Sequence, residues 1–176
     1  HCAIDFNIML NCTSFHAIRG GQLHTLDESK GTANTEELAR LIRAKFPTHK
    51  IVCYPDPAGK ARKTSAAVGV TDFSILREAG FTVLAKDKAP AIVDSVAAVN
   101  RKLLNASGDV DMLIHPRCTG LISSLERTSW LENRPETATI DKTQGVEHYT
   151  DGVRYLVDYL WPIVTSRPKI VQSSFF

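Results

Sequence analysis

Three aspartates occupy positions where a carboxylate could do chemistry. Asp5 interrupts an apolar run near the N-terminus, Asp56 directly follows a second apolar run, and Asp151 stands near the start of an expected C-terminal helix. An ionised carboxylate is costly to bury unless it is paired or bound to a metal. Carboxylate oxygens are hard ligands that suit Mg²⁺ or Mn²⁺ rather than zinc. These aspartates are therefore our candidate metal-binding and catalytic set.

The three acids meet at one site if the two apolar runs form adjacent strands and the last helix packs across their ends. Two divalent ions about 3.5–4 Å apart would then activate a water and stabilise the leaving oxygen in phosphodiester hydrolysis. In this scheme Asp5 bridges both metals, while Asp56 and Asp151 each bind one of them. Glu28 and Asp158 are the reserve candidates.

Each acid also has a purely structural explanation. Asp5 could pair with a buried Arg or Lys, Asp56 could form a turn between prolines, and Asp151 could be an N-terminal helix acid favoured by the helix dipole. His148 lies three residues before Asp151 and shares a helix face with it. We expect His148 to contact a metal-binding acid or to face DNA, with an ordinary surface histidine as the alternative.

A basic segment follows Asp56. Lys60, Arg62 and Lys63 lie in the run PAGKARKTS at residues 57–65, which lacks the glycine and serine or threonine positions of a phosphate-binding P-loop. We expect these three cations to hold a DNA phosphate beside the metals. The alternative is an ordinary solvated loop.

The order of expected elements positions these residues. Periodicity and turn signals predict strands at 3–10, 15–19 and 22–26, a helix at 34–46, a strand at 50–54, a helix at 73–79, a strand at 81–86, a helix from 90, a strand at 112–114, and helices at 121–131 and 147–160. Ile92, Val96, Val99 and Leu103 are expected to form one apolar helix face. An antiparallel start followed by alternating strands and helices predicts an α/β ribonuclease H-like fold of the RuvC/integrase type, a mixed sheet with helices on both faces.

Length and composition fit one globular domain. The chain has 176 residues and is 43% hydrophobic and 23% charged, and we expect a nuclease domain at 1–164 and a C-terminal tail at 165–176. No apolar run approaches the roughly 20 residues that span a membrane, which predicts a soluble intracellular protein. The four cysteines form no CxxC pair, so reduced thiols are expected. A net charge of +2 does not by itself indicate a nucleic-acid binder.

Several separated blocks resemble the C-terminal nuclease domain of the large terminase subunits of tailed bacteriophages. The blocks are DFN at 5–7, Glu28 after a hairpin, YPDPAGK at 54–60, TDFSILREAGF at 71–81, AVNRKLL at 98–104 and HYTDGVRY at 148–155. The likeness covers roughly residues 4–162, and the blocks follow the family's order. Gly152 stands where the family's last motif has alanine, a change that lowers helix propensity.

This resemblance implies that Asp5, Asp56 and Asp151 match the family's metal-binding acids. It implies an endonuclease that uses Mg²⁺ or Mn²⁺ to cut concatemeric viral double-stranded DNA into genome lengths. Implied partners are an ATPase domain of the same full-length protein, absent from this chain, together with the small terminase subunit and the portal protein, all in the host cell cytoplasm. The alternatives are another ribonuclease H-like nuclease, such as a junction resolvase or an RNA–DNA hybrid hydrolase, and a non-catalytic DNA-gripping module.

Overall fold

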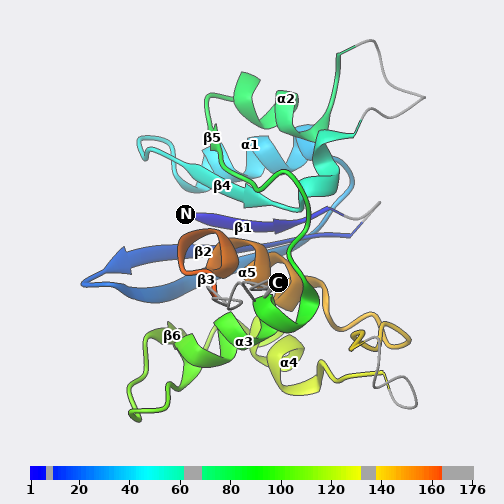
Figure 1. The fold of residues 1–176 in the computed structure, drawn as a ribbon. Coiled ribbons are helices and arrows are strands. Elements are labelled where there is room, and N and C mark those ends of the chain that lie inside the picture. Colours follow the sequence, from blue (N-terminus) through cyan, green and yellow to red (C-terminus); the bar gives the residue numbers. More distant parts are fainter. Residues whose placement is uncertain (7–9, 62–68, 132–137, 164–176) are drawn as a thin grey trace, which may run out of the picture.

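A six-stranded mixed sheet forms the centre of the molecule (Figure 1). The computed structural model describes residues 1–6, 10–61, 69–131 and 138–163. The strands are β1 (Cys2–Asp5), β2 (Asn11–Arg19), β3 (Gln22–Thr32), β4 (Val52–Pro55), β5 (Thr82–Val83) and β6 (Met112–Ile114). Their order across the sheet is β5-β4-β1-β2-β3-β6.

The first three strands form the predicted antiparallel meander. β1 pairs antiparallel with β2, and β2 pairs antiparallel with β3. Gly20 and Gly21 join β2 to β3 with φ angles of 57° and 83°, which two-residue hairpin turns favour. β2 begins at Asn11, earlier than predicted, because its buried polar residues Thr13 and Ser14 hide the strand pattern. β1 ends at Asp5, and residues 7–9 of the predicted first strand lie outside the described residues.

The remaining strands extend the sheet on both sides. β4 lies parallel to β1, with Ala3 opposite Tyr54, so the prediction that these two strands are neighbours is confirmed. β5 adds in parallel to β4, and β6 adds in parallel to β3. The helices are α1 (Thr35–Lys45), the short 3-10 helix η1 (Pro57–Lys60), α2 (Asp72–Glu78), α3 (Ile92–Leu103), α4 (Thr119–Arg127) and α5 (His148–Leu160).

Helices cover both faces of the sheet, with α1 and α2 on one side and α3, α4 and α5 on the other (Figure 1). Successive strand residues point to opposite faces. On β1, Cys2 and Ile4 pack with residues of α1 and α2, whereas Ala3 packs with residues of α3, α4 and α5. Asp5 therefore shares the face of Ala3, beneath α5.

α5 approaches the backbone of β1 closely at Gly152. A Cβ atom on Gly152 would lie 3.4 Å from the Asp5 backbone nitrogen and 3.5 Å from the carbonyl carbons of Ala3 and Ile4. These are ordinary van der Waals distances, so alanine would fit here, although glycine lowers the helix propensity. The close contact brings Asp151, the preceding residue, to the end of β1.

The predicted apolar face of α3 is confirmed only in part, because Val99 and Leu103 pack in the core while Ile92 and Val96 are only partly buried. Val99 is fully buried as expected, but the buried face of α3 also contains Ser95, Ala98 and Lys102. Ser95 accepts a hydrogen bond from Arg154 Nε of α5 at 3.0 Å. Lys102 donates to the Gly21 carbonyl at 3.1 Å. Apolar periodicity could not reveal these two buried polar contacts.

The end of α4 also differs from the prediction. α4 ends at Arg127 rather than near Leu131, because the following residues pair with a later segment. Trp130 forms an isolated antiparallel bridge with Ile140, and the Leu131 amide donates to the Thr139 carbonyl at 2.7 Å. This bridge fixes where residues 139–141 run.

The C-terminal boundary stays a prediction. Residue 164 and the predicted tail at 165–176 lie outside the described residues. Among the helices that the structure describes, none is both long and apolar enough to cross a membrane.

Candidate metal centre

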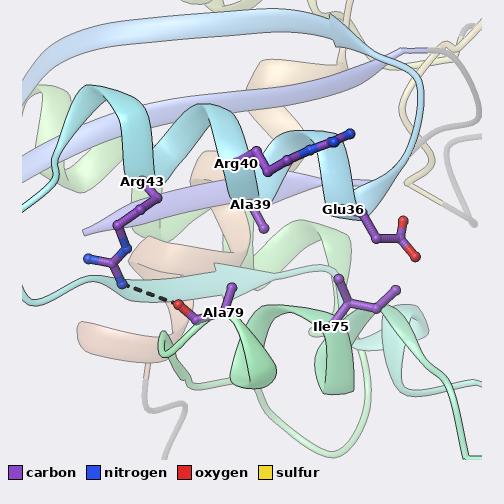
Figure 2. A pocket seen from close by; sticks show the side chains of 6 residues that line it. All are labelled: Glu36, Ala39, Arg40, Arg43, Ile75 and Ala79. Carbon is purple, nitrogen blue, oxygen red and sulfur yellow. Dashed lines mark hydrogen bonds between the residues drawn. The ribbon is translucent and has the colours of Figure 1, made fainter.

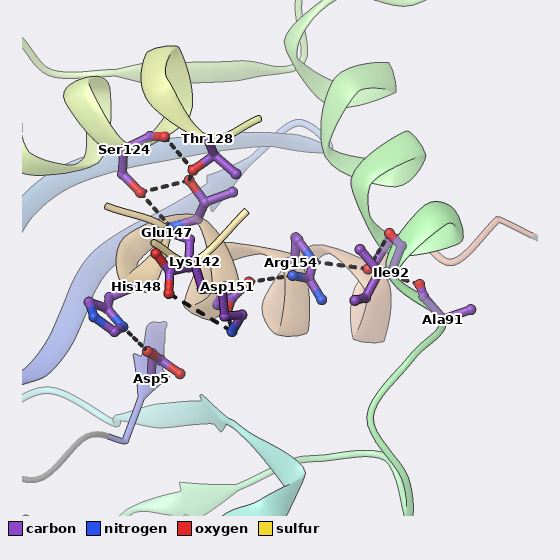
Figure 3. A network of polar contacts seen from close by, with 12 residues as sticks. Asp5, Ala91, Ile92, Ser124, Thr128, Lys142, Glu147, His148, Asp151 and Arg154 are labelled. Atoms are coloured by element: carbon purple, nitrogen blue, oxygen red, sulfur yellow. Dashed lines mark hydrogen bonds and ion pairs between the residues drawn. The ribbon is translucent and has the colours of Figure 1, made fainter. Parts of the chain in front are cut away.

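Asp5 ends β1 on the face that α5 covers, and it is only 5% exposed. Its Oδ2 lies 3.0 Å from Nδ1 of His148, the first residue of α5 (Figure 3). His148 therefore contacts one of the three candidate acids, and its role beside a metal ion or DNA stays a prediction. The imidazole is held against the carboxylate by the first turn of the helix.

The surroundings of Asp5 disfavour its negative charge. Burial is the largest effect and the charge of Asp151 the next, and together they raise the pKa of Asp5 to about 6. The charge of Asp56 also raises the pKa of Asp5, by a smaller amount, whereas the hydrogen bond and charge of His148 lower it. Below about pH 6 this carboxyl group therefore keeps its proton, and at higher pH its buried negative charge favours an additional cation.

Asp151 is buried and neutralised by two cations of the chain itself (Figure 3). Arg154 Nη1 donates to Asp151 Oδ1, and Lys142 Nζ donates to Asp151 Oδ2 at 2.8 Å. Arg154 is itself buried and also donates to Ser95, so its guanidinium is fixed on two sides. Asp151 thus has the buried ion-pair role that we had considered for Asp5.

Lys142 reaches Asp151 from the segment that follows the Trp130–Ile140 bridge. Its Nζ also lies 4.0 Å from Oε1 of Glu147. Partial burial acts to lower the pKa of Lys142, but the hydrogen bond to Asp151 and the charges of Asp151, Glu147 and Asp5 outweigh it and raise the pKa. The ammonium group therefore stays charged among carboxylates.

Glu147 directly precedes α5 and is 3% exposed. Its Oε2 is buried and has no hydrogen-bond partner within the described part of the chain. A buried polar atom without a partner usually costs about 1–3 kcal/mol, and more when it is charged. Glu147 is thus a fourth acid of the site, which the sequence analysis did not single out.

Asp56 follows β4 as predicted and caps the turn after it. Its Oδ1 accepts the Ala58 amide at 2.8 Å, and its own amide donates to the Ile4 carbonyl at 3.0 Å. The first contact belongs to the turn-forming role that we had set against metal binding, and the second continues the pairing of β4 with β1.

The pKa of Tyr155 is affected by all three candidate acids. Burial raises the pKa of Tyr155 first, followed by the charges of Asp56, Asp151 and Asp5. All three acids therefore act on one region below α5. As they stand, however, no three His, Cys, Asp or Glu side chains among the described residues form a group that could hold a metal ion.

The residues fit a divalent cation in their chemistry. Carboxylate oxygens are the ligands that Mg²⁺ and Mn²⁺ prefer, and Glu147 presents a buried oxygen without a partner in the described residues. Lys142 and Arg154 each donate to one oxygen of Asp151, so two positive charges already lie against this carboxylate. A metal ion bound to Asp151 would be repelled by these two charges.

The two reserve acids have structural roles. Both oxygens of Glu28 accept backbone amides at the start of α4, from Gly120 and Leu121, at 2.8 Å each. Asp158 is buried near the other end of α5 and pairs with Lys86 at 2.5 Å.

The predicted DNA-binding cations are only partly described. Lys60 Nζ donates to Asp87 Oδ1 at 2.9 Å and to the Lys86 carbonyl at 3.2 Å, both at exposed positions. Arg62 and Lys63 lie outside the described residues. Their contact with DNA stays a prediction.

A polar pocket of about 450 Å³ adjoins the acids on the side of His148, which is one of its lining residues. Cys12 also lines it and lies opposite Asp5 in the β1–β2 ladder. Two exposed cations, Lys30 and Arg127, line the same pocket. The pocket is therefore continuous with the Asp5–His148 pair and carries positive charge.

A second pocket, of about 440 Å³, lies between α1 and α2 (Figure 2). Its lining is mainly apolar, and Arg43 spans it by donating to the Ala79 carbonyl at 3.2 Å. None of the candidate acids lines this pocket, so we place the functional site on the α5 face.

The fold of this chain is similar to three solved terminase structures. It superposes on the large terminase of a thermophilic bacteriophage with a TM-score of 0.68 and 15% identity, covering 90% of this chain and 39% of that one. For the nuclease domain of the P22 large terminase the TM-score is 0.62, the identity 17%, and the coverage 88% and 77%. For the large terminase nuclease domain of bacteriophage SPP1, crystallised with bound Mn, the TM-score is 0.56 and the identity 14%. That superposition covers 88% of this chain and 82% of the SPP1 domain.

These likenesses establish the fold. The chain has the ribonuclease H-like fold of terminase nuclease domains, as predicted. It spans 38–39% of the length of the large terminase chains from the thermophilic phage. No family model matches the sequence, and no curated protein sequence matches it.

Replacing Asp5 by asparagine should make the metal-free protein more stable at pH 8 but not at pH 4. The pKa of Asp5 is about 6 when folded and 3.8 in the absence of the fold. Between these values the folded state holds a proton that the unfolded state has lost, so the free energy of unfolding falls as pH rises. The asparagine side chain cannot ionise, and the gain at pH 8 should be roughly 1–3 kcal/mol.

Urea unfolding of wild type and Asp5→Asn in EDTA across pH 4–8 measures this difference. Asp87→Asn, which changes an exposed acid, serves as the control. If the curves for Asp5→Asn and wild type run parallel across this range, Asp5 does not have a raised pKa and the electrostatic description is wrong.

Proposed function

We propose that this chain is a divalent-metal-dependent endonuclease that cuts double-stranded DNA during phage genome packaging. The observation that carries the proposal is the buried Asp5 carboxylate at the end of a central strand, within the electrostatic reach of Asp151 and Asp56. The fold is that of terminase nuclease domains, one of which was crystallised with bound Mn. The candidate carboxylates of the present chain suit the same kind of ion.

Asp5, Asp56 and Asp151 would together hold two Mg²⁺ or Mn²⁺ ions. When bound, such ions activate a water and stabilise the leaving oxygen of a phosphodiester. The other residues orient these ligands. His148 fixes one oxygen of Asp5, and Arg154 fixes one oxygen of Asp151. Hydrogen bonds to the ligands of a metal site typically raise affinity or activity by about 10–100-fold.

DNA would approach along the polar pocket beside His148. Lys30 and Arg127 lie on this pocket, and its one carboxylate, Glu28, is already bound by two backbone amides. A phosphate of the strand could therefore pair with these cations without meeting an unbalanced acid. Lys60, Arg62 and Lys63 would add contacts from the segment after β4.

The setting that we propose is the large terminase subunit of a packaging motor in the host cell cytoplasm. In that setting an ATPase domain of the same protein, the small terminase subunit and the portal protein would be the partners. Support comes from the fold and from the length of the large terminase chains of the thermophilic phage, of which this chain spans 38–39%.

A non-catalytic DNA-gripping module is the second candidate. The observation that favours it is that Asp151 is fully ion-paired with Lys142 and Arg154. It predicts salt-dependent DNA binding without turnover stimulated by metal. A junction resolvase or a hybrid hydrolase would instead prefer a four-way junction or an RNA–DNA hybrid over linear duplex.

Supercoiled plasmid incubated with Mn²⁺ or Mg²⁺ tests the proposed activity. Wild type should cut, EDTA should stop the cutting, and Asp5→Ala should reduce the rate by at least about 100-fold, beyond the usual effect of losing a residue that only orients a ligand. Asp158→Asn is the matched control, because it replaces a buried acid of α5 that pairs with Lys86 and should leave cutting intact. Cutting by Asp5→Ala at the wild-type rate would rule out this active site.

Replacing Lys30 or Arg127 by glutamine should weaken DNA binding and its dependence on salt. Each lost phosphate contact should lower the slope of log K against log salt by roughly 0.9. Fluorescence anisotropy with a labelled duplex in EDTA measures the slope independently of cleavage. Arg40→Gln removes an exposed cation at the α1–α2 pocket and should change nothing. Equal slopes for all three variants would exclude the pocket as a DNA contact.

A further inference from the structure

Lys142 places its ammonium group where a metal ion would also be stabilised. Its Nζ is 2.8 Å from Asp151 Oδ2 and 4.0 Å from Glu147 Oε1, and Asp5 adds a third negative charge to its surroundings (Figure 3). Ammonium groups and divalent cations are attracted to the same carboxylates. The two therefore compete for one position.

Glu147 supplies an oxygen that Lys142 leaves unsatisfied. The side chain is 3% exposed, yet its Oε2 has no hydrogen-bond partner among the described residues. Buried carboxylates in folded proteins are normally paired, hydrogen-bonded or bound to a metal. In Figure 3 the Glu147 carboxylate lies on the same side of α5 as His148, Lys142 and Asp151.

We propose that Lys142 stands in for a divalent cation in the metal-free protein, and that Glu147 joins Asp5 and Asp151 in binding the cation once Lys142 turns away. The inference rests on the proposed function for the presence of a metal. It goes beyond that function by adding a ligand and a competitor that the resemblance does not include.

The balance of charge supports this exchange. Asp5, Glu147 and Asp151 can carry three negative charges, whereas the lysine and the arginine beside them, Lys142 and Arg154, supply two positive ones. His148, beside Asp5, adds a charge only when it is protonated. Exchanging the ammonium for a divalent cation would supply the third positive charge. Buried charges are stabilised only when they are compensated in this way.

The structure also shows which cation would yield. Arg154 is buried and held by both Asp151 and Ser95. The Lys142 side chain is 58% exposed. Its backbone is anchored just upstream, where the Asp141 amide donates to the Ser129 carbonyl at 2.9 Å. A side-chain rotation into solvent is therefore enough to release Asp151, with no movement of the anchored segment.

Isothermal titration calorimetry with Mn²⁺ alone, on the full chain without DNA, tests this exchange. Lys142→Met should bind Mn²⁺ about 10-fold more tightly than wild type because the competing charge is gone. Lys142→Arg keeps the charge and should bind like wild type. Glu147→Gln, which has nearly the same shape, should bind about 10-fold more weakly. Lys86→Met is the matched control, because Lys86 pairs with a different acid of α5 and should have no effect.

The outcomes separate this inference from the proposed function. If wild type and Lys142→Met both fail to bind Mn²⁺, the proposed metal-dependent function and this inference are both wrong. If wild type binds and Lys142→Met binds equally or more weakly, Lys142 is not a competitor and the inference is overturned. If Glu147→Gln binds like wild type, Glu147 is not a ligand. Urea unfolding of each variant establishes that it is folded.

Discussion

The burial of the Asp5 carboxylate is the constraint on which the rest of the site depends. Asp5 ends a central strand, faces α5 and is almost completely removed from solvent. A buried negative charge must be balanced by a hydrogen bond, a proton or a cation. The first turn of α5 supplies His148, and the close packing at Gly152 brings Asp151 to the same place. The position of the helix on the sheet thus determines the electrostatics of the site.

Two cations balance Asp151, and they differ in how firmly they are held. Arg154 is buried between Asp151 and Ser95, so it acts as a permanent part of the helix packing. Lys142 is largely exposed and comes from a segment outside the regular elements. Functional sites often retain groups that reduce stability because the activity needs them. An exchangeable lysine would limit this loss of stability until a metal binds.

The sequence revealed the parts of the site that depend on local pattern. Asp5 was recognisable because apolar residues surround it, and the adjacency of β1 and β4 followed from two buried runs. The pairing of Arg154 with Asp151 could have been predicted from the sequence, since Arg154 lies three residues after Asp151 on one helix. Lys142 and Glu147 were missed because their roles arise from a bridge between distant segments and from burial. The face of α3 was predicted only in part for the same reason, because the buried Ser95 contacts Arg154 of another helix.

Anomalous diffraction from a crystal of this chain soaked in Mn²⁺ tests the central claim most directly. The claim is that the buried acids below α5 form a metal centre whose ligands include Asp5 and Asp151. We expect an anomalous peak in contact with both carboxylates, with the Lys142 side chain turned away from Asp151. A crystal saturated with Mn²⁺ that shows no peak at these acids and an intact Lys142–Asp151 ion pair would contradict the account.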